Sequence, residues 1–526
     1  MRIEWHVSTD KEEFAGAINH ESGPLHVRIP CVASEIESIL ADIHLEIDDD
    51  EKIFMNGYQT WTACPEYTKN DKIRGLHGLP KFMIDHYSFD RYGDYHFVDY
   101  PNKKGVTHGF SWTWFKKGDH YRFLGSLDED PGYTMFTYDA NRSNLHIERD
   151  AKGLKCDGEI KAFDLFYAEG SESEVFDAWF KELGIEPNDK RLYGYSSWYN
   201  RYQNITEADI LKDLEGCRSV FEPGDMFQID DGWEPFIGDW LAADEKKFPL
   251  GMKAVADKIH EAGFKAGLWL APFVAEEKSK LYQEHQDWLL KVDGKNWKAG
   301  CNWSGYYPLD IDNPEVQDYL KQVFERVFEQ WGFDMVKLDF LYAVAPYGSE
   351  NETRAGKMHR AMKWIRELCG DKEILGCGVP LMPAFGLVDY CRISCDVGLD
   401  YNDNPIMRII HRERVSTRQA VWNILSRHGL NGRAWGSDGD VIFLRTENIK
   451  LTEQQKDSLA RMDALLENVL LTSDDPSNYT DEMKAKYKML RHLTTATNIR
   501  LSTDNGITIT YDLDGEEHTE KIDWKL

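Results

Sequence analysis

The pattern of apolar and polar positions changes twice along this chain of 526 residues. Up to about residue 185, short apolar runs such as PLHVRIP, FSWTWF and YTMFTYD are separated by Gly, Pro, Asn and Asp. This spacing is typical of antiparallel strands joined by turns. We therefore expect an N-terminal antiparallel β-sandwich over residues 1–188, with a helix at 171–185.

The middle of the chain repeats a different unit, in which a short apolar run is mostly followed by an amphipathic helix. Strands that alternate with helices form parallel βαβ units, so eight such runs predict a closed (β/α)8 TIM barrel over residues 189–482. The eight runs are YGYSSWY, MFQIDD, AGLWLAPF, MVKLDF, EILGCGV, YCRISCD, RAWGSDGD and NVLLTSDD.

The end of the chain returns to the pattern of strands. The runs IRLSTD, ITITYDL and HTEKIDWKL are separated by DNG and DGEE, which are hairpin-turn signals. We expect a small C-terminal β domain over residues 483–526 that packs on the barrel.

The formal charge of −29 narrows the range of partners. It repels phosphate backbones and anionic lipid surfaces, which argues against nucleic-acid and membrane partners and favours a neutral or cationic small molecule. No apolar run approaches the about 18 residues of a membrane span, and the first residues show no apolar leader. Nine scattered cysteines without a CxxC pair are typical of free thiols in a cytoplasmic protein. The oligomeric state stays open.

Polar side chains gather where the predicted barrel strands end, which is where catalytic residues lie in such barrels. Carboxylates there bind a divalent metal, hold sugar hydroxyls, or act as a nucleophile and acid pair. None of the 17 histidines falls at these ends, so we expect neither a metal nor another cofactor. The candidate residues are Trp198, Asp230, Asp231, Trp233, Trp269, Lys337, Asp339, Phe340, Cys377, Gly378, Arg392 and Asp396.

Two strand ends combine an aspartate with a cationic residue. Asp339 lies in the apolar run FDMVKLDFLY, where a carboxylate is costly to bury unless it is paired. Lys337 points to the same face of the strand, so we expect it to favour the ionised form of Asp339. Arg392 and Asp396 also alternate onto one face, and a purely structural ion pair between them is the alternative.

The adjacent carboxylates of Asp230 and Asp231 suit neighbouring hydroxyls on one face of a sugar. For the indoles of Trp198, Trp233 and Trp269, packing in the core is as good an interpretation as substrate binding. Packing is the better reading for Phe340, and a small buried side chain is the better reading for Cys377.

Six stretches carry a resemblance to a known family: NGYQTW, FQIDDGWE, FPLGMKAVADKIHEAGFKAGLWLAPF, MVKLDFLYA, ILGCGVPLMPAFGLVDYCRISCD and RAWGSDGD. In this order they resemble the α-galactosidases (melibiases) of glycoside hydrolase family 36, above all the compact bacterial members. The resemblance implies a β-sandwich, a barrel and a C-terminal β domain. It also implies a retaining exo-α-galactosidase that hydrolyses terminal α-linked galactose from oligosaccharides such as melibiose and raffinose.

The resemblance also implies roles for individual residues. Asp339 looks like the catalytic nucleophile and Asp396 like the general acid/base. Asp230 and Asp231 look like ligands of the galactose O4 and O6 hydroxyls. The remaining substrate-binding candidates include Lys337 and Arg392 as further hydroxyl ligands, and Trp269 and Trp61 as aromatic walls, Trp61 reaching the barrel from an N-terminal loop.

The chain departs from the family in two respects. Many members show DxNR after the fourth strand, whereas this chain has Asp339-Phe340-Leu341-Tyr342, and its N-terminal region is short. The alternatives within the enzyme class are an α-N-acetylgalactosaminidase or a transglycosylase of the raffinose-synthase kind. A non-catalytic sugar-binding protein on the same fold is the alternative from another class.

Overall fold

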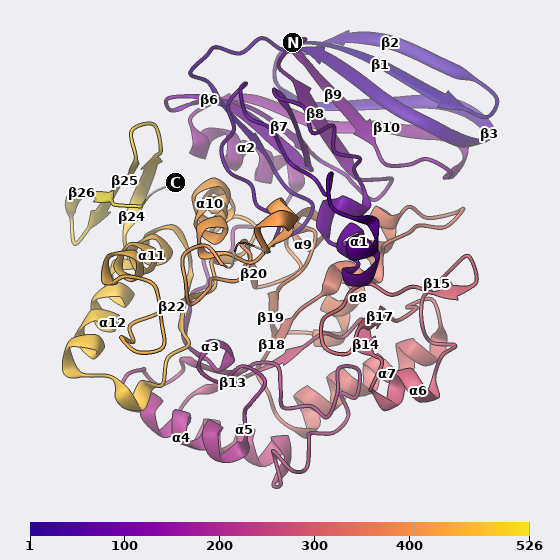
Figure 1. Ribbon diagram of the computed structural model, residues 1–526. Coiled ribbons are helices and arrows are strands. Elements are labelled where there is room, and N and C mark those ends of the chain that lie inside the picture. The colour runs from indigo at the N-terminus through magenta and orange to yellow at the C-terminus, as the bar shows by residue number, and fades with distance from the viewer. Residues whose placement is uncertain (404, 406, 525–526) are drawn as a thin grey trace.

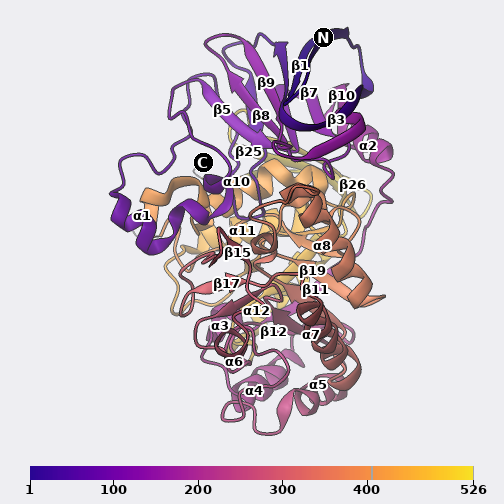
Figure 2. The same cartoon turned by 90° about the vertical axis from the view of Figure 1, so that its right-hand side faces the viewer.

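A computed structural model describes residues 1–403, 405 and 407–524 of the chain. The N-terminal sandwich lies on one side of the central barrel, and the small C-terminal sheet lies beside it (Figures 1 and 2). The helix α1 (Lys81–Tyr87) belongs to a long N-terminal segment that leaves the sandwich and lies over the barrel. The fold class predicted from the sequence is confirmed.

The N-terminal part contains ten antiparallel strands in two layers that share the long strand β3 (Gly23–His44). Residues 23–35 of β3 pair with β10 (Lys155–Gly170), and residues 36–43 pair with β1 (Arg2–Thr9). Rings from both layers meet in the core, for example Phe115 and Tyr138, whose centroids are 4.9 Å apart. The other strands are β2 (Glu13–Asn19), β4 (Lys52–Met55), β5 (Val106–Phe110), β6 (Trp112–Lys117), β7 (His120–Ser126), β8 (Thr134–Asp139) and β9 (Asn144–Arg149).

The helix expected at 171–185 is α2 (Glu172–Leu183). It begins at a capping box, in which Ser171 and Glu174 satisfy each other's backbone N–H groups. Its apolar face packs under the sandwich, where Trp179 is fully buried and donates from Nε1 to the carbonyl of Ser126 at 2.9 Å.

The barrel is a parallel sheet in the order β21-β20-β19-β18-β13-β12-β11-β23-β22. Strand β21 pairs with β20, and β22 pairs with β23. The two short strands together take the place of one interrupted barrel strand between β20 and β23, and they close the barrel. Asp440, with φ 107°, lies in the break. The strands are β11 (Leu192–Ser196), β12 (Met226–Ile229), β13 (Lys265–Leu270), β18 (Met335–Leu338), β19 (Glu373–Gly376), β20 (Tyr390–Arg392), β21 (Gly436–Asp438), β22 (Val441–Ile442) and β23 (Val469–Thr472).

Helices cover the outside of the barrel, and several of them start where the sequence places a capping residue. The hydroxyls of Thr206 and Thr452 accept from the backbone N–H three residues on, in capping boxes. The outer helices are α4 (Glu207–Cys217), α5 (Gly251–Glu261), α7 (Pro314–Glu325), α8 (Arg354–Cys369), α9 (Leu381–Ala384), α10 (Thr417–Arg427), α11 (Glu453–Leu466) and α12 (Asp481–Leu493). Short elements in the loops are α3 (Trp198–Arg201), β14 (Val274–Glu276), α6 (Lys280–Glu284), β15 (Lys291–Val292), β16 (Lys295–Asn296) and β17 (Tyr306–Pro308).

The last sheet has three antiparallel strands, β24 (Thr497–Ser502), β25 (Ile507–Leu513) and β26 (Glu516–Ile522). It contacts the sandwich, since Thr503 donates to Glu66 at 2.8 Å, and it contacts α11, since Arg461 donates to Glu520 at 3.1 Å. The domain boundaries at 188/189 and 482/483 stay predictions, and the second falls inside α12.

Candidate active site

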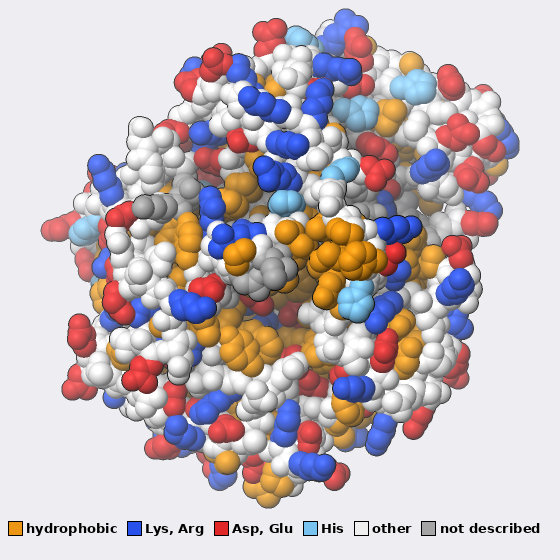
Figure 3. Space-filling model, viewed as in Figure 1, with side chains coloured by type: hydrophobic (Ala, Val, Ile, Leu, Met, Phe, Trp, Pro, Cys, Tyr) orange, Lys and Arg blue, Asp and Glu red, His pale blue; other side chains and the backbone are white. Residues whose placement is uncertain are grey.

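The register of the barrel strands brings the predicted residues to one end of the barrel. Trp269 of β13 lies opposite Lys337 of β18, and Arg392 of β20 lies opposite Asp438 of β21. Successive side chains point to opposite faces of a strand, so Val336 and Leu338 pack in the core while Lys337 points into the barrel. Figure 3 shows a hollow near the middle of this face of the molecule, rimmed by hydrophobic side chains.

Asp339, directly after β18, is held by two donors. Trp269 donates from Nε1 to Asp339 Oδ2 at 3.2 Å, and the backbone N–H of Phe340 donates to Asp339 Oδ1 at 2.8 Å. Phe340 itself has φ 53°, so the chain turns sharply after the aspartate. Both carboxylate oxygens are therefore oriented by neighbours before any substrate binds.

Burial raises the pKa of Asp339 above its ordinary value of 3.8. The positive charge of Lys337 lowers this pKa and the negative charge of Asp396 raises it. The sequence-based expectation for Lys337 thus has the right direction, but burial outweighs it. The ammonium of Lys337 forms its ion pair with Asp230 Oδ2, at 2.8 Å.

Asp396 lies four residues beyond β20 and is the more accessible carboxylate. Its side chain is 37% exposed, and Asp396 Oδ1 accepts from Arg392 Nη1 at 2.8 Å. Arg392 is buried and also donates to Asp438 Oδ2 at 3.2 Å and to Asp440 Oδ1 at 2.7 Å. The Arg392–Asp396 ion pair that the sequence suggested is present, within a larger group of acids.

Asp440 connects this group to α3, the short helix that follows the first barrel strand. The hydroxyl of Tyr199 donates to Asp440 Oδ2 at 2.5 Å, and the backbone N–H of Val397 donates to the same oxygen at 2.9 Å. Burial raises the pKa of Asp440 to about 7, with the charge of Arg392 opposing it and that of Asp396 adding to it. Asp440 thus fixes both Arg392 and the backbone that follows Asp396.

Asp230 and Asp231, after β12, accept several hydrogen bonds. Asp230 Oδ2 accepts from Gln228 Nε2 at 2.7 Å as well as from Lys337. Asp231 Oδ2 accepts from Gln203 Nε2 at 2.8 Å and from Trp303 Nε1 at 3.0 Å. These contacts hold both carboxylates rigidly at the barrel end.

Glu234 lies buried beside Asp231. Burial raises the pKa of Glu234 well above its usual range, and the charge of Asp231 adds to this effect. Both causes favour the neutral acid, which can donate a hydrogen bond to Asp231.

Trp61 reaches the barrel from the N-terminal part of the chain. Its ring lies edge-on to Phe340 and Tyr342, with centroids 5.0 and 5.9 Å away. A Cβ atom on Gly378, which has φ 53°, would lie 2.8 Å from the Trp61 ring, so only glycine suits this contact. Tyr58, from the same loop, is buried against Phe110 and Tyr133 of the sandwich.

The remaining predicted residues divide between the site and the core. Cys377 is buried next to Asp339, and burial raises the pKa of its thiol well above the usual range. Trp198 is partly buried at the start of α3 and contacts Tyr202 edge-on at 5.3 Å. Trp233 is fully buried, donates to the carbonyl of Trp269 at 3.0 Å, and packs on Trp331. This position favours the packing reading for Trp233.

The sequence patterns missed several residues of the site. Trp303, in the loop after the third strand, contacts Asp231 and lies 4.9 Å from the Phe340 ring. No periodicity marks Trp303, because a loop between β16 and β17 carries it. Gln203 and Glu234 were also missed, whereas Tyr199 and Asp440 lie at the ends of the predicted runs YGYSSWY and RAWGSDGD but were not among the candidates.

A polar cleft of about 590 Å³ is separate from the candidate active site, since none of the predicted site residues lines it. It is lined by residues of α8 and of the sandwich, among them Asp130 and Arg360. Four of its charged side chains pair with one another, Arg360 with Glu352 and Lys363 with Asp130. Most of the charge that lines this cleft is thus compensated within the protein.

Among the residues that the structure describes, no group of three or more His, Cys, Asp or Glu side chains is arranged to hold a metal ion. Within the same residues, no helix combines the length and apolar character needed to cross a membrane.

Sequence comparison connects the chain to known enzymes. The profile of the Melibiase family matches residues 196–370. The α-galactosidase Mel36A of Lactobacillus acidophilus is 34% identical over 151 residues, which are 27% of this chain and 20% of that protein. The α-galactosidase of Escherichia coli is 28% identical over 193 residues, 35% of this chain and 26% of that protein. The matched part thus spans a fifth to about a quarter of these relatives.

Structural comparison extends the likeness to nearly the whole chain. TtGalA, an α-galactosidase from Thermus thermophilus in complex with p-nitrophenyl α-D-galactopyranoside, has a TM-score of 0.75 at 26% identity and coverage of 98% of both chains. AgaA of Geobacillus stearothermophilus, a GH36 α-galactosidase, has a TM-score of 0.62 at 14% identity, over 97% of this chain and 71% of that one, and supports the fold alone. Residues 196–370 thus match the Melibiase family, and the chain is similar to α-galactosidases both in sequence and, in TtGalA, in structure.

Proposed function

We propose that this protein is a retaining exo-α-galactosidase that releases terminal α-linked galactose from oligosaccharides such as melibiose and raffinose. The observation that carries the proposal is the meeting of Asp339 and Asp396 at one end of the barrel, beside the buried Asp230–Lys337 pair. The structural neighbour TtGalA supports it, since that enzyme is described with p-nitrophenyl α-galactoside and with stachyose bound.

In the first step, the carboxylate of Asp339 attacks the anomeric carbon of galactose while the bond from that carbon to the leaving oxygen breaks. Asp396 donates its proton to the leaving oxygen, and a galactosyl ester of Asp339 results. In the second step, Asp396 takes a proton from water as the water attacks the anomeric carbon. The ester bond to Asp339 breaks as the bond to water forms, which frees the carboxylate, and two inversions give net retention.

The environments of the two carboxylates suit these roles. Asp339 is oriented by Trp269 and the Phe340 amide, so its oxygens are placed for attack without a search through rotamers. Asp396 is accessible, so it can meet a leaving group and then a water molecule. Its contact with Arg392 holds it in place during both steps.

The rest of the site supplies the recognition of a neutral sugar. Asp230 and Asp231 offer carboxylate oxygens, and Lys337 offers an ammonium, to hydroxyls on one face of galactose. The indoles of Trp61, Trp269 and Trp303 surround the same region and provide apolar faces for sugar C–H groups. A cytoplasmic location stays a prediction from the cysteine content.

A panel of p-nitrophenyl glycosides tests the proposal. We expect hydrolysis of the α-galactoside, of melibiose and of raffinose, with a much lower kcat/KM for the α-N-acetylgalactosaminide. A preference for the α-N-acetylgalactosaminide would indicate an α-N-acetylgalactosaminidase. Galactosyl transfer that dominates when sucrose is added would indicate a transglycosylase. Binding of these glycosides without turnover would make the protein a non-catalytic sugar binder.

Trp61→Ala is expected to raise KM for melibiose by about tenfold, because the mutation removes an apolar wall that contacts bound and reacting sugar alike. The fold should persist, since Trp61 is only partly buried. Steady-state kinetics and a thermal melt measure the two effects. Unchanged kinetics would return Trp61 to a packing role, and Trp61→Phe serves as the control that keeps an aromatic wall.

Lys337→Met is expected to shift the acid limb of the kcat/KM profile to higher pH by about one unit, because a nearby positive charge lowers the pKa of a carboxylate by this order. Ionised Asp339 is the reactive form, so kcat/KM falls as the pH drops through its pKa. Burial already raises this pKa, and Lys337 opposes the rise, so removal of the charge raises it further. Lys337→Arg keeps the charge, and an acid limb that stays in place in Lys337→Met would contradict the proposed coupling.

A further inference from the structure

The start of the loop that carries Trp61 packs on the sandwich through Tyr58, but residues 59–64 are hydrogen-bonded by the barrel. Most of these bonds come from the helix α10 and from the short helix η5 (Met407–Glu413) that precedes α10. Both follow β20, so they belong to the same connection of the barrel as Asp396.

Residues of α10 bind the backbone of the loop. Arg427, fully buried, donates from Nη1 to the carbonyl of Thr60 at 2.7 Å and to the carbonyl of Ile393 at 2.8 Å. Asn423 donates to the carbonyl of Thr62 at 3.0 Å and accepts from the amide of Cys64 at 2.8 Å. Arg427 thus joins the residue before Trp61 to the strand end that leads to Asp396.

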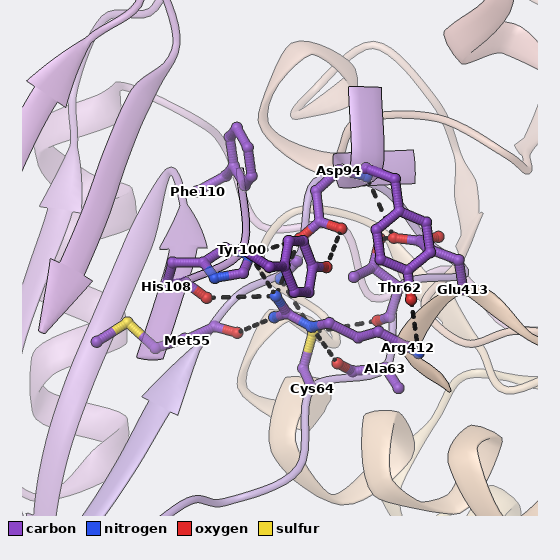
Figure 4. Close-up of polar contacts among 12 residues, drawn as sticks. Met55, Thr62, Ala63, Cys64, Asp94, Tyr100, His108, Phe110, Arg412 and Glu413 are labelled. Atoms are coloured by element: carbon purple, nitrogen blue, oxygen red, sulfur yellow. Dashed lines mark hydrogen bonds and ion pairs between the residues drawn. The ribbon is translucent and has the colours of Figure 1, made fainter. Parts of the chain in front are cut away.

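Arg412 of η5 binds the following part of the loop, as Figure 4 shows. It donates from Nε to the carbonyl of Ala63 at 2.9 Å and from Nη2 to the carbonyl of Met55 at 3.1 Å. Its charge is balanced by Asp94, whose Oδ2 lies 3.0 Å from Arg412 Nη1. Asp94 comes from the N-terminal segment that lies over the barrel.

Glu413, the next residue, contacts side chains on both sides of Trp61. Its Oε1 accepts from the Thr62 hydroxyl at 2.6 Å, and its Oε2 accepts from Gln59 Nε2 at 3.4 Å. The amide of Asp94 donates to Oε1 at 3.3 Å, and a Cβ atom on Gly93 would lie 2.0 Å from the carboxyl group. The carboxyl of Glu413 is therefore enclosed between the Trp61 loop and the segment at Gly93.

We propose that Glu413 is a positioning residue for Trp61 and thereby a determinant of substrate affinity. It ties Gln59 and Thr62, which flank Thr60 and Trp61, to the barrel connection that also carries Asp396. This inference rests on the proposed function, in which Trp61 forms a wall of the sugar site. Glu413 contacts neither Asp339 nor Asp396 among its described hydrogen bonds, so it acts through Trp61.

The charge state of Glu413 gives this role a pH dependence. Burial raises the pKa of Glu413 to about 7, and the charge of Asp94 adds to the rise while Arg412 opposes it. Burial also acts to raise the pKa of Asp94, but Arg412 and His108 outweigh it and lower that pKa to about 2, so Asp94 is ionised. The charge of Glu413 in turn acts on the pKa of five further neighbours, which are Arg427, Tyr58, Tyr95, Tyr100 and Tyr342.

The raised pKa of Glu413 makes the closed position of the Trp61 loop depend on pH. In an open arrangement with Glu413 in water, its pKa would return to its ordinary value of 4.5. The closed arrangement binds the proton more tightly, so it loses stability relative to the open one as the pH rises from about 4.5 to about 7. Above about pH 7 Glu413 is ionised in both arrangements, so the stability of the closed arrangement relative to the open one no longer changes with pH.

The experiment measures the position of Trp61 separately from activity. The full chain is labelled with 5-fluorotryptophan, and the ¹⁹F signal of Trp61 is assigned by its disappearance in Trp61→Phe. We expect this signal to shift with pH in the wild-type protein, with a midpoint near pH 7. In Glu413→Gln the titration should disappear, because the amide keeps an oxygen that accepts from Thr62 and has no proton to lose.

The kinetic arm uses the same variants with melibiose. Glu413→Ala is expected to raise KM by about tenfold and to leave kcat within about twofold, the pattern of a lost contact that binds ground state and transition state alike. Glu413→Gln should keep a KM near the wild-type value. If Glu413→Ala fails to fold, Thr62→Val decides the matter, since it removes the donor to Glu413 with little change of shape.

A matched control lies in the sandwich core. Tyr138→Phe removes one buried hydroxyl, which donates to the carbonyl of Leu45 at 2.9 Å, and should leave KM and the Trp61 signal unchanged. An unchanged Trp61 signal in folded Glu413→Ala, or in Thr62→Val, would overturn the positioning role. A shifted signal with unchanged KM would overturn the link to affinity. Absence of α-galactoside hydrolysis by the wild-type protein would refute the proposed function while the ¹⁹F arm still reads the position of Trp61.

Discussion

Asp339→Gly is expected to lower kcat for melibiose by at least about 10⁴, the order seen when a catalytic nucleophile is removed. No other described side chain occupies the end of β18 with its oxygens fixed by both an indole and a backbone amide. The loss should appear in kcat and in kcat/KM together, because covalent attack occurs only in the transition state. Steady-state assays at saturating substrate measure it.

Azide provides the control for this variant. With p-nitrophenyl α-galactoside as substrate, azide fits the space left by the carboxylate and attacks from the same side. The expected product is the β-galactosyl azide, with inverted configuration, which NMR identifies. Full activity of Asp339→Gly in the absence of azide would refute its assignment as nucleophile.

Asp396→Gly should have an effect that depends on the leaving group. Melibiose needs protonation of its leaving oxygen, so kcat/KM for this substrate is expected to fall by about 10² to 10⁴, the usual contribution of general acid catalysis. p-Nitrophenolate leaves without a proton, so kcat/KM for its galactoside should fall much less. The galactosyl ester then accumulates, because water lacks its general base, and a burst of p-nitrophenol should precede the slow steady state.

Azide separates the roles of the two aspartates. In Asp396→Gly, azide attacks the galactosyl ester from the side opposite Asp339, so the expected product is the α-galactosyl azide. The same anomer from both variants would contradict the assignment of a nucleophile and an acid/base. Equal losses for melibiose and for the p-nitrophenyl substrate would remove Asp396 from its role as general acid.

The predictable part of the site lies on the barrel strands. Alternation along a strand places Lys337 and Asp339 on one side and Val336 and Leu338 on the other, so their faces follow from local chain geometry. The carboxyl ends of parallel barrel strands lie at one end of the barrel. The sequence therefore predicts that Asp230, Lys337 and Arg392 lie close together. In the structure, Lys337 of β18 donates to Asp230 after β12, and Arg392 of β20 donates to Asp438 of the neighbouring β21.

Residues on loops escaped prediction for a physical reason. Trp303 and Glu413 are placed by contacts with segments up to several hundred residues away, such as Thr62 for Glu413, and loop geometry has no periodicity to reveal them. Trp233 is the opposite case. It follows Asp231 closely in the chain, yet the turn after β12 sends its indole into the core against Trp331.

The direction of the Asp339 pKa was also beyond sequence reasoning. Neighbouring charge can be read from Lys337, two positions away, but burial is a property of everything that surrounds the carboxylate in space. It is burial that raises the pKa of Asp339 against the effect of Lys337.

The local alternation of apolar and polar residues was enough to predict the layered β-sandwich, the eight strand positions of the barrel and the short final sheet. The sequence also placed the acids at the strand ends. The folded chain shows in addition that β21 and β22 share one broken position, that Trp61 lies against Gly378, and that Glu413 hydrogen-bonds to Gln59 and Thr62 on either side of Trp61. Those features depend on contacts between distant segments, where side-chain packing and buried hydrogen bonds rather than periodicity select the arrangement.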